Sequence, residues 1–177
     1  METDVAAAEF LLDRGADRVE HPGGTLFAHL RRVHAMLGEW GARRELCLAG
    51  LCHAFYGTDG FGVALGDHGR RGELVQVIGA EAERLVHLYA SCDRGRSYPH
   101  LASPDGPFTD RFTGTVQVPP PADRRDFAEL TVANELDVLT ASAEMRAAHG
   151  RSLAELFITW QPLLSPSANR AVQNFRP

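Results

Sequence analysis

Apolar residues recur at helical spacing along most of the chain. The clearest case is the segment from about Thr25 to residue 37, whose regularly spaced apolar residues are Leu26, Leu30, Val33 and Leu37. Such a stripe is typical of a helix that packs one face against a core. The following segment, from about 43 to 55, is apolar on nearly every side. It therefore predicts a central, buried helix.

The remaining pattern predicts further helices and one irregular insert. The helices are expected at about 3–14, 70–78, 80–90, 123–141 and 152–160. Residues 91–123 are rich in proline, and Thr113-Gly114 within them suits the turn of a small β-hairpin. A non-helical insert of this length in a small domain often forms a lid over a site.

The predicted fold class is therefore all-α, a helical bundle interrupted by the proline-rich insert. We expect one domain over residues 1–164. Residues 165–177 contain few apolar anchors and are expected to form a loosely packed tail.

Composition excludes several kinds of chemistry. The chain of 177 residues has a net charge of -5, and no basic stripe suggests a nucleic-acid partner. All of its basic residues are arginines, which excludes a Schiff-base or phosphate-loop lysine. The three cysteines have no zinc-ligand spacing, and their odd number favours the reducing cytoplasm. No apolar run approaches a membrane span, so we expect no membrane partner.

Two histidines lie on apolar helical surfaces. His29 interrupts the stripe of its helix, and His53 ends the buried helix that follows. If these helices pack side by side, both imidazoles meet at one point. Asn134 and Asp137 share one face of a later helix. The four side chains His29, His53, Asn134 and Asp137 could together bind one divalent transition metal, Fe, Mn or Zn. The alternative is that each histidine is a core residue satisfied by an ordinary hydrogen bond.

Polar residues near this constellation are further candidates. Tyr56, Thr58 and Asp59 follow His53 in a loop, and two arginines, Arg94 and Arg111, lie in the insert. We assign Tyr56, Thr58, Arg94 and Arg111 to substrate binding. The candidate catalytic residues are His53, Asp59 and Asp137.

Three segments resemble the HD superfamily of metal-dependent phosphohydrolases, most of all the hydrolase domains of stringent-response alarmone enzymes. They are His29-Leu30-Arg31-Arg32-Val33, Ala49-Gly50-Leu51-Cys52-His53 and the run from Leu130 to Asp137. The resemblance covers about residues 20–141. It implies an HD-like helical bundle with one histidine ligand on each of two neighbouring helices and a last ligand on a later helix.

The chain departs from the superfamily pattern at its acidic positions. Ala54 stands where an aspartate follows the second histidine, and Asn134 aligns with the final aspartate ligand. Gly57-Thr58 replaces an acidic pair that assists attack by water. Loss of two carboxylates weakens a site for a hard cation such as Mg²⁺. Segments such as His21-Pro22-Gly23-Gly24-Thr25-Leu26 and Tyr89-Ala90-Ser91-Cys92-Asp93-Arg94 also resemble a group of actinobacterial proteins without known activity.

Several hypotheses for function follow from these residues. In the first, an altered HD-type hydrolase acts on a small phosphorylated or anionic molecule through metal-activated water. The others are an iron oxygenase of the same fold, a metal-free enzyme with histidine acid–base catalysis, and a non-catalytic protein that binds a small molecule or a partner. A homodimer is compatible with all of them.

Overall fold

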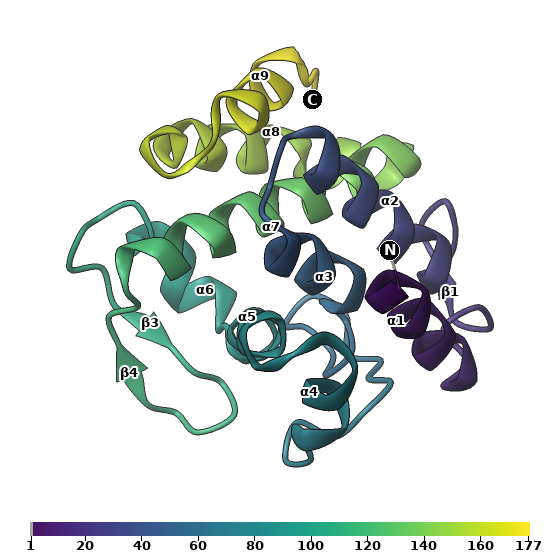
Figure 1. Ribbon diagram of the computed structural model, residues 1–177. Coiled ribbons are helices and arrows are strands. Elements are labelled where there is room, and N and C mark those ends of the chain that lie inside the picture. Colours follow the sequence, from purple (N-terminus) through teal and green to yellow (C-terminus); the bar gives the residue numbers. More distant parts are fainter. Residues whose placement is uncertain (1) are drawn as a thin grey trace.

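The structure is a computed structural model that describes residues 2–177, and it is predominantly helical (Figure 1). The major helices are α1 (Glu2–Asp13), α2 (Leu26–Glu39), α3 (Arg44–Cys52), α4 (Gly72–Ile78), α5 (Ala80–Ser91), α7 (Pro121–Ala141), α8 (Ala143–Thr159) and α9 (Pro166–Asn174). A short hairpin of β1 (Glu20–His21) and β2 (Gly24–Thr25) precedes α2. The all-α prediction is confirmed at this level, with two small antiparallel sheets added.

Helices α2 and α3 form the pair that the hydrophobic pattern predicts. The hydroxyl of Thr25 caps α2 by accepting a hydrogen bond from the backbone nitrogen of Ala28 at 3.2 Å. The predicted stripe on α2 is buried, and His29 is buried with it. Every residue from Leu46 to Cys52 on α3 is buried as well, so α3 lies in the interior.

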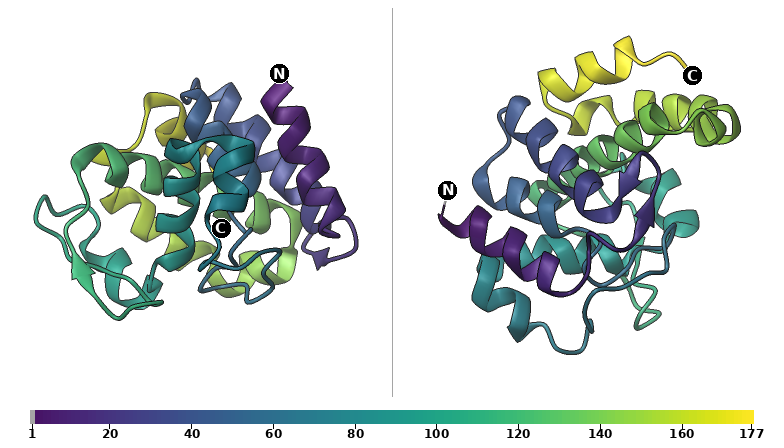
Figure 2. Two further views of the ribbon diagram at one scale, coloured as in Figure 1. Left: turned by 60° about the horizontal axis from the view of Figure 1, so that its bottom comes forward. Right: turned by 90° about the vertical axis from the view of Figure 1, so that its right-hand side faces the viewer.

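Helix α7 passes through the middle of the molecule and contacts α2, α3, α5, α8 and α9 (Figures 1 and 2). Its residues from Phe127 to Leu139 are all buried, including five that are polar or charged: Glu129, Thr131, Asn134, Glu135 and Asp137. Polar side chains in an interior need partners. Their partners on neighbouring helices are described below.

The insert between α5 and α7 is more ordered than the proline-rich pattern suggests. It contains α6 (Arg94–Ser97), the 3₁₀ turn η1 (Tyr98–His100), and the strands β3 (Phe108–Thr109) and β4 (Val116–Gln117). The strands form the expected hairpin around Thr113-Gly114, with Phe108 opposite Gln117. The loop between η1 and β3 is held by the buried guanidinium of Arg124 on α7, which donates hydrogen bonds to the carbonyls of Leu101, Ser103 and Pro104.

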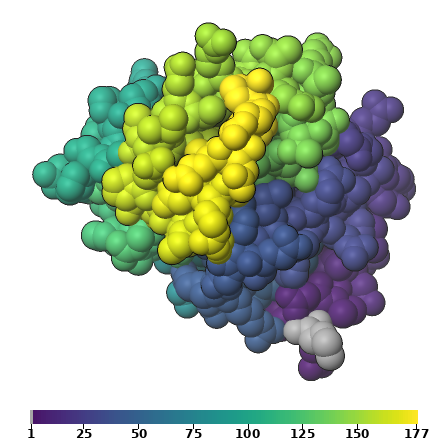
Figure 3. All heavy atoms as spheres, turned by 90° about the horizontal axis from the view of Figure 1, so that it is seen from above, coloured from purple at the N-terminus to yellow at the C-terminus, as the bar shows by residue number. Residues whose placement is uncertain are grey.

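The C-terminal segment differs from its prediction. Helix α8 begins at Ala143, nine residues before the expected start, because Ser142 caps it by accepting from the backbone nitrogen of Met145. The tail expected to be loosely packed forms α9, which lies across the surface beside α8 (Figure 3). The hydroxyl of Ser165 caps α9 and also donates to the Glu129 carboxylate, while Ala168 and Val172 are buried. Ala171 and Phe175 also pack against the core, so this short segment is anchored along its whole length.

Within residues 2–177, no helix combines the length and apolarity that crossing a bilayer requires.

The contact between α2 and α3 predicts opposite effects for two glycine substitutions. A Cβ atom on Gly50 would lie 2.5 Å from Cδ1 of Leu37, whereas one on Gly38 would meet no atom within 4 Å. We expect Gly50→Ala to lower the free energy of unfolding by about 1–3 kcal/mol through overpacking. Gly38→Ala, the matched control on α2, should raise it by up to about 1 kcal/mol. Urea denaturation of both variants measures this, and an unchanged midpoint for Gly50→Ala would contradict the packing.

Candidate functional site

His29, His53 and Asn134 meet at one buried point, here called the histidine centre. The Nε2 atoms of His29 and His53 are 3.3 Å apart, and Oδ1 of Asn134 is 3.0 Å from Nε2 of His29. His29 is completely buried, and His53 is 2% exposed. The side chains come from α2, from the residue that follows α3, and from α7, so three of the most closely packed helices position them.

The hydrogen bonds around His53 determine where its proton lies. Its Nδ1 atom is 2.8 Å from the carbonyl oxygen of Gly50, which can only accept, so Nδ1 carries the hydrogen. Burial, together with repulsion from His29, lowers the pKa of His53 to about 3. The neutral ring therefore presents a lone pair at Nε2, toward His29.

His29 is oriented in the same way by a carboxylate. Its Nδ1 atom lies 2.6 Å from Oδ2 of Asp137, and Arg32 donates to both oxygens of that carboxylate at 2.7 and 2.9 Å. Burial favours a raised pKa for Asp137, but the hydrogen bonds from His29 and Arg32 outweigh it and hold the pKa below its ordinary value. Asp137 is thus ionised and accepts from Nδ1–H of His29, which leaves Nε2 of His29 facing the centre.

Asn134 supplies the third atom of the centre. Its amide nitrogen donates to Oε1 of Glu135 at 3.1 Å, so its oxygen is the atom turned toward His29. Three atoms that accept hydrogen bonds therefore converge: two imidazole nitrogens and one amide oxygen. Such an arrangement is stable only if a positive charge or a shared proton lies among them, either a proton on Nε2 of His29 or a metal ion.

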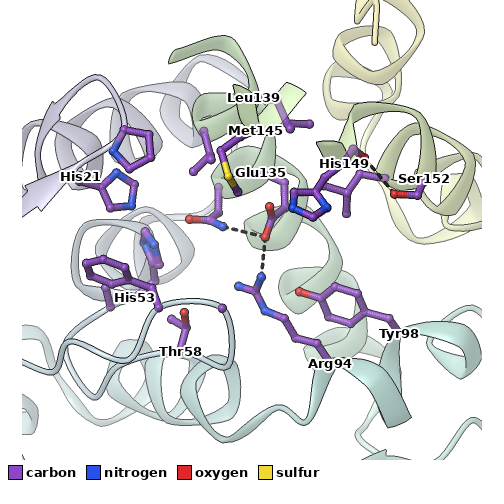
Figure 4. Close-up of a pocket in the computed structure, with 17 residues that line it drawn as sticks. His21, His53, Thr58, Arg94, Tyr98, Glu135, Leu139, Met145, His149 and Ser152 are labelled. Atoms are coloured by element: carbon purple, nitrogen blue, oxygen red, sulfur yellow. Dashed lines mark hydrogen bonds and ion pairs between the residues drawn. The ribbon is translucent and has the colours of Figure 1, made fainter. Parts of the chain in front are cut away.

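The histidine centre forms one end of a cavity of about 400 Å³ (Figure 4). His53 and Asn134 line this end, together with Thr58 and His21. The ring of His21 stacks on that of His29 with centroids 4.0 Å apart, and burial lowers the pKa of His21 to about 4. A neutral imidazole thus covers the centre from the side of the β1–β2 hairpin.

The opposite end of the cavity is built by the insert and by α8. Arg94 of α6 donates to Oε1 of Glu135 at 2.8 Å, and this carboxylate is the one that holds the Asn134 amide. Tyr98 follows on η1, and α8 contributes His149 and Ser152 (Figure 4). The expectation that the insert covers a site agrees with this arrangement, since α6 and η1 form part of the wall.

Only some of the residues predicted to bind substrate line the cavity. It brings Thr58 and Arg94 to the cavity, but not Tyr56 or Arg111. Tyr56 is directed elsewhere because its hydroxyl donates to the buried carboxylate of Glu83 at 3.0 Å. Arg111 donates to the carbonyl of Ala90 at 2.7 Å and lies over the ring of Phe112. The assignment of these two residues to substrate binding is therefore corrected.

The roles predicted for two acidic residues, Asp137 and Asp59, also change. Asp137 does not face the histidine centre, because His29 and Arg32 occupy its two oxygens. It was predicted to be a metal ligand, but it contacts the centre only through the ring of His29. Asp59 is exposed and accepts a hydrogen bond from the backbone nitrogen of Arg94 at 2.8 Å. It fixes the start of α6 and does not line the cavity. Neither residue is placed to act directly on a bound molecule.

Among the cavity residues that the sequence argument missed are four with titratable side chains: His21, Tyr98, Glu135 and His149. His21 lies in the β1–β2 hairpin, before the apolar stripe of α2 begins, and Glu135 lies next to Asn134 in a helix whose buried face is unusually wide. Tyr98 lies in the irregular insert, where no periodic pattern indicates which side chains point inward. His149 precedes the predicted start of its helix, so the sequence pattern did not place it on α8.

A metal ion bound at the histidine centre would need the amide oxygen of Asn134 as a ligand. Among residues 2–177, no group of three or more His, Cys, Asp and Glu side chains is placed to hold a metal ion. Asn134 would be the third ligand beside the two histidines. Both imidazoles already have the outer partners that metal-bound histidines usually have, a carboxylate for His29 and a carbonyl for His53. The donor set therefore fits a transition metal.

Comparisons with known proteins identify one relationship. Residues 10–94, slightly less than half of the chain, match a family model described as a domain of unknown function, DUF6817. The match includes His29, His53 and Arg94 but ends before α7, which carries Asn134. No curated protein matches the chain, and no solved structure matches it.

The low pKa of His53 predicts acid sensitivity. An unfolded histidine binds a proton near pH 6.5, whereas folded His53 stays neutral down to about pH 3. The free energy of unfolding should therefore fall as the pH drops through this window, by about 1.4 kcal/mol per pH unit for each such group. Urea denaturation in a chelator, from about pH 7 to about pH 5, measures the slope. His53→Asn should reduce the slope, and exposed His100→Asn should not. An equal slope in His53→Asn would refute the assignment.

Proposed function

We propose that the histidine centre is the active site of an altered HD-type hydrolase, which binds one divalent transition metal and cleaves an ester of a small anionic molecule. The observation that carries this proposal is the convergence of three acceptor atoms, from His29, His53 and Asn134, at the end of a cavity. The order of the elements that hold them, α2, the end of α3 and α7, agrees with the order that the resemblance to the HD superfamily implies.

The kind of metal follows from the donors. Imidazole nitrogens suit Zn²⁺ or Fe²⁺, and the carbonyl oxygen of the Asn134 amide also suits Mn²⁺, whereas Mg²⁺ and Ca²⁺ prefer several carboxylates, which the centre lacks. All three donors are uncharged, so they leave the charge of the ion uncompensated. That charge favours a substrate with an anionic group at this end. When bound, the ion would supply a Lewis acid and lower the pKa of a water molecule.

The chain's own residues hold this arrangement in place. Asp137 fixes the ring of His29 and is itself held by Arg32. The Gly50 carbonyl fixes His53, and Glu135 turns the Asn134 amide so that its oxygen faces inward. Positioning of this kind lowers the cost of reaching the reactive geometry, because the groups do not reorganise when a substrate enters.

One observation favours a metal-free alternative. Asp137, His29 and His53 form a continuous chain of hydrogen-bonding side chains, and the ring of His53 lines the cavity. A proton on Nε2 of His29 would also satisfy the three acceptors. In that case His29 and His53 would move a proton to or from a bound molecule. Dependence on metal separates the two proposals.

Metal content is the first test. Protein purified without a histidine tag should carry close to one equivalent of Zn, Fe or Mn, measured by mass spectrometry of the metal. His53→Ala should lose it, because one of three ligands is removed. His100→Ala, which removes an exposed imidazole outside the cavity, should retain it. Wild-type protein that takes up no metal, even when these ions are added, would exclude the metal-dependent version.

Hydrolysis is the second test. Metal-loaded protein should release 4-nitrophenol from 4-nitrophenyl phosphate, and His53→Ala should reduce kcat/KM by at least about 100-fold. A chelator should abolish the activity, and added metal should restore it. Activity that survives the chelator but is lost in His53→Ala would instead support the metal-free alternative. No release of 4-nitrophenol or of phosphate from any phosphoester tested would argue against a hydrolase.

A further inference from the structure

The cavity has two chemically different ends (Figure 4). One end is the histidine centre, and the other is formed by Arg94, Tyr98 and His149. The rest of the lining is mainly apolar and includes Phe61, Val138, Leu139, Met145 and Leu153. A pocket with an apolar wall and a few polar groups at its ends suits a small, largely apolar molecule bound lengthwise.

The hydroxyl of Tyr98 has no hydrogen-bond partner in the described chain, although the residue is only 8% exposed. Figure 4 shows this hydroxyl directed toward the space beside Arg94 and His149. The other two tyrosines are satisfied: Tyr56 donates to Glu83 at 3.0 Å, and Tyr89 accepts from Arg94 at 3.3 Å. An unpaired buried hydroxyl is unfavourable, so a partner from outside the chain is expected.

The ring of Tyr98 is held rigidly, so the hydroxyl cannot turn away to find another partner. It packs edge-on against Trp160 with centroids 5.1 Å apart and against Phe127 at 6.2 Å. The backbone carbonyl of Tyr98 accepts from the indole nitrogen of Trp160 at 3.3 Å. The position of the hydroxyl is therefore a fixed property of the cavity.

The charges at this end are already balanced within the chain. Arg94 is paired with Glu135 at 2.8 Å, and the same carboxylate accepts from Asn134. An anion placed beside Arg94 would be repelled by Glu135. A polyphosphate would need several unpaired cations, and Arg94 is the only arginine among the residues that line this cavity. The far end thus favours an uncharged hydrogen-bonding group.

We infer that the Tyr98 end is a specificity subsite for an uncharged hydroxyl or carbonyl group of a small, largely apolar substrate. The substrate's single anionic group would then lie at the histidine centre, an orientation that rests on the proposed function. Nucleotide polyphosphates are outside this class. The subsite itself is defined by the cavity and the Tyr98 hydroxyl and does not depend on metal or on catalysis.

Binding of two small probes to the intact, catalytically idle protein tests the subsite. p-Cresol and toluene differ by one hydroxyl, and their affinities are measured by NMR titration in a chelator. We expect p-cresol to bind wild-type protein about 5-fold more tightly, the middle of the range for one hydrogen bond. Tyr98→Phe should remove this difference, whereas Tyr56→Phe, outside the cavity, should keep it. Equal affinities in wild-type protein would overturn the inference.

A second pair of measurements guards against misfolding. Tyr98→Phe should unfold at the wild-type temperature or above, because it removes a hydroxyl without a partner, while Tyr56→Phe should unfold earlier. With ring-labelled tyrosine, the resonance left after assigning Tyr56→Phe and Tyr89→Phe belongs to Tyr98. It should shift with p-cresol and not with toluene. No such shift would overturn the inference even if Tyr98→Phe fails to fold.

A charged probe decides between an uncharged and an anionic partner. p-Toluate carries a carboxylate in place of the hydroxyl and should bind more weakly than p-cresol. If p-toluate displaces p-cresol and Tyr98→Phe weakens both, the subsite is one for anions and the inference is wrong. Absence of metal or of phosphoesterase activity would contradict the proposed function while leaving the probe results unaffected, so the two failures are distinguishable.

Discussion

The hydrogen bond between Nδ1 of His29 and the carboxylate of Asp137 is the contact on which the rest of the site depends. It joins α2 to α7 across 108 positions of the chain, in a fully buried setting. Because Asp137 is ionised and held by Arg32, it determines which nitrogen of His29 carries hydrogen. Everything else at the histidine centre follows from the direction in which the other nitrogen then points.

The centre is unusual in its charge balance. Its inner atoms come from two imidazoles and an amide, while the carboxylates Asp137 and Glu135 bind the outer side of these groups. Arg32 and Arg94 pair with those carboxylates in turn. The charged side chains are therefore paired one layer outside the histidine centre, and under the proposed function the inner position holds a cation. This arrangement distinguishes it from sites whose inner ligands are acidic.

Much of the architecture was predictable because burial repeats at a fixed spacing. The inward direction of His29, the central position of α3 and the shared face of Asn134 and Asp137 all follow from helical periodicity. The same argument failed where two helices bury most of their surface or where the chain is irregular. It placed Asp137 among the inner ligands, and it sent Tyr56 and Arg111 to the cavity, although Glu83 and the Ala90 carbonyl hold these two elsewhere.

The sequence by itself determined the helical class, the central helix pair and the position of the two histidines on apolar helical surfaces, because each depends on local periodicity. That the two imidazoles meet was decided by the packing of the helices. Only the tertiary structure decided which partner each buried polar group has. His29 and Arg32 bind the two oxygens of Asp137, and Glu135 orients the amide of Asn134. The structure also showed that the hydroxyl of Tyr98 has no hydrogen-bond partner among residues 2–177. Hydrogen bonds between residues far apart in the chain depend on the relative placement of helices, and no local pattern records that placement.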